Sequence, residues 1–414
     1  MRLRTRPGHP DLLDLPWSVP LEDWDHERVV EVARGAHRHV VRFVDYDGAL
    51  YALKELPRRV AEREYRMLRR MAEEGLPVVE AVGVVNRDRG LEDVLITRYL
   101  DYSLPYRMLF ARVSREQRDV RGLSDRLLDA LVMLLVRLHL AGFSWGDCSL
   151  NNTLFRRDAG ALAAYVVDVE TGEWHEELTA GQREADLDIT TLNVAGGLMD
   201  LQAQFDLPAE PDPTEVVDDL RARYENLWHE LTSDEVIAPG DRYRVEARMR
   251  RLNELGFDVD EVDIISDEEG DRLIIRTLVA EAGHHRRRLL SLTGLTAQEN
   301  QARSLLNDLA NFRAYHEQQE GRPMAETVAA YRWLSEVFEP TVAAIPPEHR
   351  AKREAAELFH EVIEHKWFLS EQQGIDVGVE AALQSYIETV LPAEPEERNV
   401  LQHGELAEGW ITYG

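Results

Sequence analysis

The feature that most constrains this chain is a polar loop from Gly142 to Asn152, which reads Gly-Phe-Ser-Trp-Gly-Asp-Cys-Ser-Leu-Asn-Asn. An apolar pattern of helical period over 127–140 runs into the loop. An apolar strand pattern over 164–167 follows it and ends at Asp168. The chain thus presents Asp147, Asn152 five residues later, and a second Asp after the next strand. Because Asp and Asn are common in loops, this spacing gains weight only if matching residues lie upstream.

An Asp, an Asn and a second Asp in this order are typical of the lower half of a phosphoryl-transfer site. In such a site the first Asp, here Asp147, takes the proton of the acceptor hydroxyl. The Asn and the second Asp, here Asn152 and Asp168, hold Mg²⁺ against the phosphates. Asn151 is an alternative metal ligand, although the spacing of five favours Asn152. Glu170 is a further candidate for a metal contact.

Composition narrows the class of protein. A length of 414 residues predicts two domains, and a formal net charge of -29 argues against a general nucleic-acid binder or an anionic membrane surface as partner. The single cysteine, Cys148, excludes an intrachain disulfide. No apolar run approaches the ~18 residues of a membrane span, and no apolar segment follows the basic N-terminus. We therefore expect a cytoplasmic protein without a membrane span.

The region upstream of the loop predicts a small antiparallel sheet and one helix. Residues 1–27 are rich in Pro but also apolar, and we interpret them as an arm packed on a domain surface. Asp47-Gly48 is a hairpin signal. Period-2 and apolar patterns predict five strands and one helix, with the strands at 29–32, 40–44, 50–56, 78–85 and 94–96 and the helix at 61–71.

Lys54 lies in the third of these strands, where a phosphoryl-transfer site needs a lysine for the α- and β-phosphates. Of 48 basic residues only three are lysines, so 45 are arginines, and a lysine at this position is unlikely by chance. The helix must supply a glutamate to orient Lys54. We favour Glu64 over Glu62 because apolar residues follow Glu64 at i+3 and i+4.

The turn between the first two strands is a poor phosphate-binding loop. Repeated glycines normally let backbone N–H groups approach the phosphates. Here Gly35 is the single glycine, flanked by Ala33 and Ala36. We nevertheless name Gly35 as a nucleotide contact, with Arg34 as a possible source of charge.

With Lys54, Glu64, Asp147, Asn152 and Asp168 in order, the first half of the chain resembles the protein-kinase-like superfamily. The terse loop around Trp145-Gly-Asp is most similar to the bacterial lipopolysaccharide (Kdo/WaaP-type) kinase-like proteins. The resemblance implies an α+β fold with a bilobal protein-kinase-like domain, namely an antiparallel five-stranded N-lobe and a helical C-lobe. It also implies ATP and Mg²⁺ as cofactors and an acceptor with a free hydroxyl.

Downstream, the chain resembles a mainly actinobacterial group with a helical C-terminal domain of unknown function. The resemblance rests on 332–340 and 359–367. A Pro-rich stretch over 208–213 is the best linker, and 259–265 with 273–279 predict a hairpin. Helical patterns cover 216–231, 241–255, 296–319, 324–344, 350–373 and 377–390. We thus expect an arm (1–27), a kinase-like domain (28–205), an α-rich domain (206–393), which is also a candidate for self-association, and an acidic tail (394–414).

Two features depart from the kinase pattern. Trp145 stands where His or Arg usually precedes the Gly-Asp pair, and Val169-Glu170 replaces Phe-Gly after Asp168. Two alternatives therefore stay open: a nucleotide-binding pseudokinase, and a nucleotidyl transferase on the same fold. Asp186 and Asp188 could brace the loop from below, and an equally plausible interpretation is that they favour the start of a helix.

Overall fold

The computed structural model describes residues 1–32, 39–88, 90–106, 109, 120–205, 212–233, 235–237, 247, 250, 252, 257–266, 273–394 and 396–398. The chain divides into two compact units. Among the described residues, the first unit comprises those within 1–156 and 164–224, and the second comprises those within 157–163 and 225–398. The expected tail, 394–414, and the predicted helix at 241–255 lie almost wholly outside the described residues.

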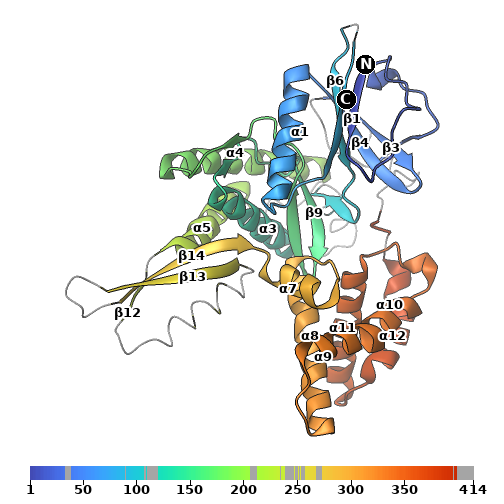
Figure 1. The fold of residues 1–414 in the computed structure, drawn as a ribbon, viewed down its shortest axis with the longest axis vertical. Coiled ribbons are helices and arrows are strands. Elements are labelled where there is room, and N and C mark those ends of the chain that lie inside the picture. Colours follow the sequence, from blue (N-terminus) through green and yellow to red (C-terminus); the bar gives the residue numbers. More distant parts are fainter. Residues whose placement is uncertain are drawn as a thin grey trace. The chain divides into compact units, whose positions relative to one another are not determined.

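The first unit begins with an antiparallel sheet in the order β1-β5-β6-β4-β3-β2. Its strands are β1 (Arg2–Thr5), β2 (Val29–Val30), β3 (Val41–Tyr46), β4 (Ala49–Leu56), β5 (Ala81–Asn86) and β6 (Asp93–Arg98). Helix α1 (Arg58–Glu73) packs on β5 and β6 (Figure 1). The mixed α+β class and the antiparallel N-terminal sheet agree with the prediction.

The predicted number of five strands is wrong, because the arm supplies a sixth. β1 pairs with β5, and Thr5 lies opposite Gly83. A Cβ atom at Gly83 would come within 2.3 Å of the Arg4 carbonyl oxygen, so glycine there lets the two backbones approach. Further along the arm, five apolar side chains are buried and form one core cluster with Val44, Leu53 and Val82 of the sheet, namely those of Leu12, Leu15, Trp17, Leu21 and Trp24.

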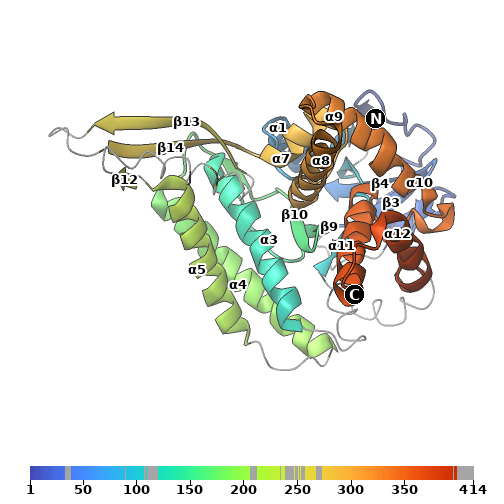
Figure 2. The ribbon, with the colours of Figure 1, turned by 90° about the horizontal axis from the view of Figure 1, so that it is seen from below.

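Below the sheet, helices and short strands alternate. Helix α3 (Val120–Leu140) leads into β8 (Phe143–Ser144), which pairs with β11 (Glu173–Trp174). Strand β9 (Thr153–Asp158) lies between β10 (Ala161–Val166) and β7 (Ser103–Pro105). Helices α4 (Ala180–Phe205) and α5 (Pro213–Thr232) follow, and α3, α4 and α5 lie side by side in Figure 2. The loop that opened the sequence therefore runs between α3 and β9.

The second unit contains a sheet and a group of helices. Strands β12 (Glu235–Ile237), β13 (Phe257–Ser266) and β14 (Leu273–Ala282) form an antiparallel sheet. This sheet contains the predicted hairpin and adds one strand. The helices are α7 (His284–Thr293), α8 (Glu299–Glu320), α9 (Glu326–Trp333), the π-helix η2 (Leu334–Phe338), α10 (Glu339–Ala344), α11 (Ala355–Gln373) and α12 (Gly378–Thr389). The helical C-terminal part is therefore as predicted.

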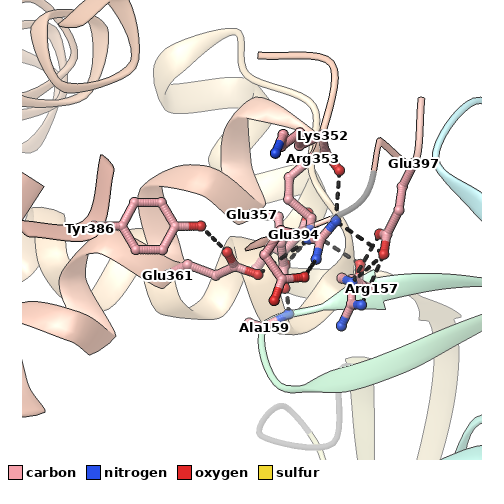
Figure 3. A network of polar contacts seen from close by, with 10 residues as sticks. Arg157, Ala159, Lys352, Arg353, Glu357, Glu361, Tyr386, Glu394 and Glu397 are labelled. Carbon is pink, nitrogen blue, oxygen red and sulfur yellow. Dashed lines mark hydrogen bonds and ion pairs between the residues drawn. The ribbon is translucent and has the colours of Figure 1, made fainter. Parts of the chain in front are cut away.

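A buried polar network holds the second unit together around Arg157 and Arg353 (Figure 3). The Glu397 carboxylate accepts hydrogen bonds from Nε and Nη2 of Arg157, at 2.9 Å each, and lies 3.0 Å from Nη1 of Arg353. Glu394 also pairs with Arg353. The side chain of Arg353 is 2% exposed and that of Glu397 is 3% exposed. Glu394 and Glu397 are thus held by ion pairs with an arginine that is almost wholly removed from water.

Candidate active site

Lys54 lies between two carboxylates. Its Nζ donates to Oε1 and Oε2 of Glu64 at 3.2 and 3.3 Å, and to Oδ2 of Asp168 at 2.5 Å. Strand β4 supplies the lysine, helix α1 supplies Glu64, and the segment after β10 supplies Asp168. Because α1 buries one face, Glu64 points inward with Met67 and Leu68. The structure therefore joins three residues that lie up to 114 positions apart.

Burial sets the charge states of this group. The Glu64 side chain is 1% exposed. Burial, followed by the charge of Asp168, raises the pKa of Glu64 to about 7 although Lys54 acts in the opposite direction. Burial acts to lower the pKa of Lys54, but the Glu64 and Asp168 carboxylates outweigh it and raise that pKa. Lys54 is therefore held as a cation.

Asp147 is positioned by two asparagines. Asn152 donates through Nδ2 to Oδ2 of Asp147 at 2.9 Å and to its carbonyl oxygen at 3.0 Å. Asn193 of α4 donates to Oδ1 of Asp147 at 3.2 Å and to the carbonyl oxygen of Cys148 at 3.1 Å. Burial raises the pKa of Asp147, against the hydrogen bond from Asn152. The carboxylate is thus fixed at both oxygens.

Asp186 braces the loop from α4. Its carboxylate accepts hydrogen bonds from the backbone N–H groups of Trp145 (2.7 Å) and Gly146 (2.8 Å), and it contacts Nε2 of His139 at 3.1 Å. Burial would raise the pKa of Asp186, but the hydrogen bonds from His139 and the two amides lower it. Asp188 faces elsewhere and pairs with Arg221 at 2.5 Å. Of the two acidic candidates, only Asp186 contacts the loop.

Trp145 links the two halves of the site. Its indole Nε1 donates to the carbonyl oxygen of Asp168 at 2.7 Å, and its own carbonyl oxygen accepts from Oγ1 of Thr171 at 2.8 Å. The side chain is fully buried. A tryptophan at this unusual position therefore fixes the backbone that carries Asp168.

Glu170, a candidate metal contact by sequence, lies instead against His39, with 3.1 Å between Oε2 and Nε2. Gly35 lies outside the described residues, as do Ala33, Arg34 and Ala36. Asn151 has a buried Oδ1 that accepts no hydrogen bond from the part of the chain that the structure describes. The structure thus brings together five of the six predicted site residues, namely Lys54, Glu64, Asp147, Asn152 and Asp168.

Sequence reasoning missed Asn193, His139 and the role of Trp145 in holding Asp168. Asn193 and His139 lie on helices, and neither belongs to a local pattern that marks a site.

Within the described ranges, no cluster of three or more His, Cys, Asp or Glu side chains could hold a metal ion on its own. Mg²⁺ commonly takes one or two protein ligands and completes its shell with phosphates and water. Asn152 fits such a ligand, because no described residue donates to its Oδ1.

The helices of the described part include none that is long and apolar enough to cross a membrane.

No curated protein matches the chain. Among solved structures, it is similar to the one described as "WaaP in complex with acyl carrier protein", at 19% identity over 55% of this chain and 100% of that chain, with a TM-score of 0.36. It is also similar to a chain of the yeast RNA Pol II CTD kinase CTDK-1 complex, at 15% identity over 38% of this chain and 51% of that chain, with a TM-score of 0.28.

Two family models match the sequence. One, described as the lipopolysaccharide kinase (Kdo/WaaP) family, matches residues 47–195. The other, described as a domain of unknown function (DUF4032), matches residues 226–391. The first match spans every member of the group around Lys54 and Asp147. The chain therefore combines a domain of the lipopolysaccharide kinase (Kdo/WaaP) family with a C-terminal DUF4032 domain.

Proposed function

We propose that this chain is a phosphotransferase that uses ATP and Mg²⁺ and moves the γ-phosphate to a hydroxyl group of an acceptor. The observation that carries the proposal is the position of Lys54 between Glu64 and Asp168, at 3.2 and 2.5 Å. A partly buried lysine held by a buried glutamate is the arrangement that fixes an ammonium against nucleotide phosphates. The family match to residues 47–195 supports the same reaction class.

Each residue then has a defined task. Lys54 would contact the α- and β-phosphates, and Glu64 orients it. Asn152 and Asp168 would hold Mg²⁺, which neutralises charge on the phosphates when bound. Asp168 already lies beside a cation, since its Oδ2 accepts from Lys54. Asp168 also offers carboxylate oxygen, which is the ligand type that Mg²⁺ prefers.

Asp147 would orient the acceptor hydroxyl and accept its proton. Its two oxygens are fixed by Asn152 and Asn193, which leaves the carboxylate one orientation. Partial burial raises its pKa, which makes it a stronger base than a free carboxylate. Catalysis would rest on positioning and on charge stabilisation, without a covalent intermediate.

The test uses ATP labelled at either the α- or the γ-phosphate, with Mg²⁺ and a panel of sugars, lipids and generic protein acceptors. We expect γ-label transfer that is lost in Asp147→Ala and Asp168→Ala. Asp188→Ala is the matched control, because Asp188 pairs with Arg221 on the surface and should retain activity. Lys54→Arg should weaken ATP binding, because a planar guanidinium does not replace a compact ammonium.

The other outcomes separate the alternatives. Transfer of the α-label would indicate a nucleotidyl transferase. Binding of ATP without transfer to any acceptor would favour a pseudokinase. Absence of ATP binding by the wild-type chain would overturn all three functions.

A further inference from the structure

Helix α4 presents an apolar stripe to solvent, next to the side of the helix from which Asn193 and Asp186 contact the candidate active site. We call it the α4 seam, and it consists of Ala185, Ile189, Leu192, Gly196, Met199 and Ala203, all exposed. Leu192 is 74% exposed, Met199 53% and Ile189 38%. Large exposed apolar side chains are ordinary when scattered, but a contiguous stripe marks an interaction surface.

The spacing of the seam is that of a helix-pairing surface. Its members are separated by 4, 3, 4, 3 and 4 residues, which is the a/d pattern of a heptad repeat. The inner face of the same helix is already used, since Asp186, Leu187, Thr190, Val194 and Leu201 are buried. The seam is therefore a second apolar face, in excess of what the fold of the first unit needs.

Gly196 is a second, independent sign of a partner. A glycine in a helix interior is destabilising relative to alanine, so it usually has a packing reason. A Cβ atom at Gly196 would meet nothing within 4 Å. The described residues give no packing reason for glycine here, whereas close approach of another helix does.

The seam is complementary to itself in the antiparallel direction. Its members lie in pairs at equal distances from Val194: Leu192 and Gly196 at two residues, Ile189 and Met199 at five, Ala185 and Ala203 at nine. Two such helices related by a twofold axis would place Leu192 of each copy over Gly196 of the other. Ile189 would meet Met199, and Ala185 would meet Ala203. Leu192 over Gly196 joins a large residue with a small one, whereas the second pair joins two large residues and the third two small ones. Each copy thus uses the same patch, as an isologous interface requires.

We propose that two copies of this chain associate through antiparallel pairing of their α4 seams. The charges next to the seam, Asp188 and Asp200, disfavour an anionic membrane as the occupant. In the paired arrangement Asp188 lies nearest Gln202 of the second copy rather than another carboxylate. The interface is independent of whether the site transfers phosphate.

The first test is the mass of the full chain in solution, by sedimentation equilibrium at several concentrations. The wild type should form a dimer, and Leu192→Asp should weaken the association at least about tenfold. Since each copy carries a net charge of -29, added salt should strengthen the wild-type dimer by screening repulsion. Trp367→Asp, at a side chain 65% exposed on α11, is the matched control and should leave the dimer intact.

A second test fixes the direction of pairing. The one native cysteine, Cys148, is fully buried, so a disulfide between two copies can form only between introduced cysteines. Ile189→Cys combined with Met199→Cys should give a disulfide-linked dimer under mild oxidation. Met199→Cys alone should not, because antiparallel pairing separates the two copies of this position by about 15 Å along the axis.

Three results would overturn the proposal. The first is a wild type that stays monomeric at every concentration. The second is a dimer that Trp367→Asp dissociates and Leu192→Asp does not, which would place self-association in the helical domain. The third is cross-linking of Met199→Cys alone as efficiently as of the double variant, which would indicate parallel pairing.

Discussion

Asn193 holds Asp147 from a helix that begins 33 residues after it, with 3.2 Å between its Nδ2 and the carboxylate Oδ1. The same amide group also donates to the carbonyl oxygen of Cys148. Asn193 therefore fixes both the side chain of Asp147 and the backbone next to it.

Replacing Asn193 with alanine should lower kcat by about 10- to 100-fold, because a catalytic group displaced by about 1 Å can cost that much. The Km for ATP should change little, since Asn193 contacts neither Lys54 nor Asp168. Steady-state kinetics with the acceptor identified by label transfer measures both. Thr191→Ala, on the same helix and bonded only to the Asp188 carbonyl oxygen, is the control. A loss confined to the Km for ATP would contradict a role in positioning Asp147.

Asp186 and Asp188 give a matched pair of variants. Asp186→Asn removes one acceptor from a buried carboxylate that serves two backbone amides and His139, and it should lower the free energy of unfolding by about 2–3 kcal/mol. Asp188→Asn breaks an ion pair whose Asp side chain is 66% exposed, which is worth at most about 1 kcal/mol. Chemical denaturation compares the two. Equal losses would mean that the contact of Asp186 with the loop is not the source of its effect.

The residues that could be predicted from sequence share one property, since each occupies a position set by a local pattern. Lys54 follows from a strand, Glu64 from the inner face of a helix, and Asn152 from its distance to Asp147. Asn193 could not be found in this way, because its contact with Asp147 arises from how α4 packs on the loop. Which of Asp186 and Asp188 contacts the loop likewise depends on which side of α4 faces the loop, and the sequence pattern alone does not predict that.

The elements of the fold also divide into those that a local pattern predicts and those that depend on a distant partner. The α+β class, the antiparallel sheet, α1 and the downstream helices follow from periodicity and turn signals. Strand β1 does not, because Arg2–Thr5 is short and polar and becomes a strand only through the edge that β5 offers at Gly83. Structure that a segment gains from a distant partner is not visible in its own sequence.

The raised pKa of Glu64 predicts a change of stability with pH. Its folded-state pKa of about 7 lies above the ordinary value of 4.5, so the folded chain binds the proton more tightly than the unfolded chain. The stability from this site is thus fully present below about pH 4.5 and is lost as the pH rises to about 7, on the order of 3 kcal/mol in all. Thermal unfolding should show the wild type losing stability relative to Glu64→Gln across that window.

Glu62→Gln is the control for this titration, because Glu62 lies on the same helix and pairs with Arg4 at the surface. It should keep the pH dependence of the wild type. If Glu64→Gln and the wild type change in parallel from pH 4.5 to 7, Glu64 is not the group that titrates.

Glu397 is expected to hold the second unit together. Its carboxylate pairs with Arg157 and with Arg353, and the side chains of Arg353 and Glu397 are 2% and 3% exposed (Figure 3). Glu397→Ala removes one partner of a buried guanidinium that keeps Glu394, and it should lower the free energy of unfolding by about 1–3 kcal/mol. Glu396→Ala, at an exposed neighbouring position, should cost little. Hydrogen exchange localises the effect: protection should fall in α11, which carries Glu357 and Glu361 of the same network, and stay unchanged in α4. Equal loss of protection in both helices would instead assign Glu397 a role in the stability of the whole chain.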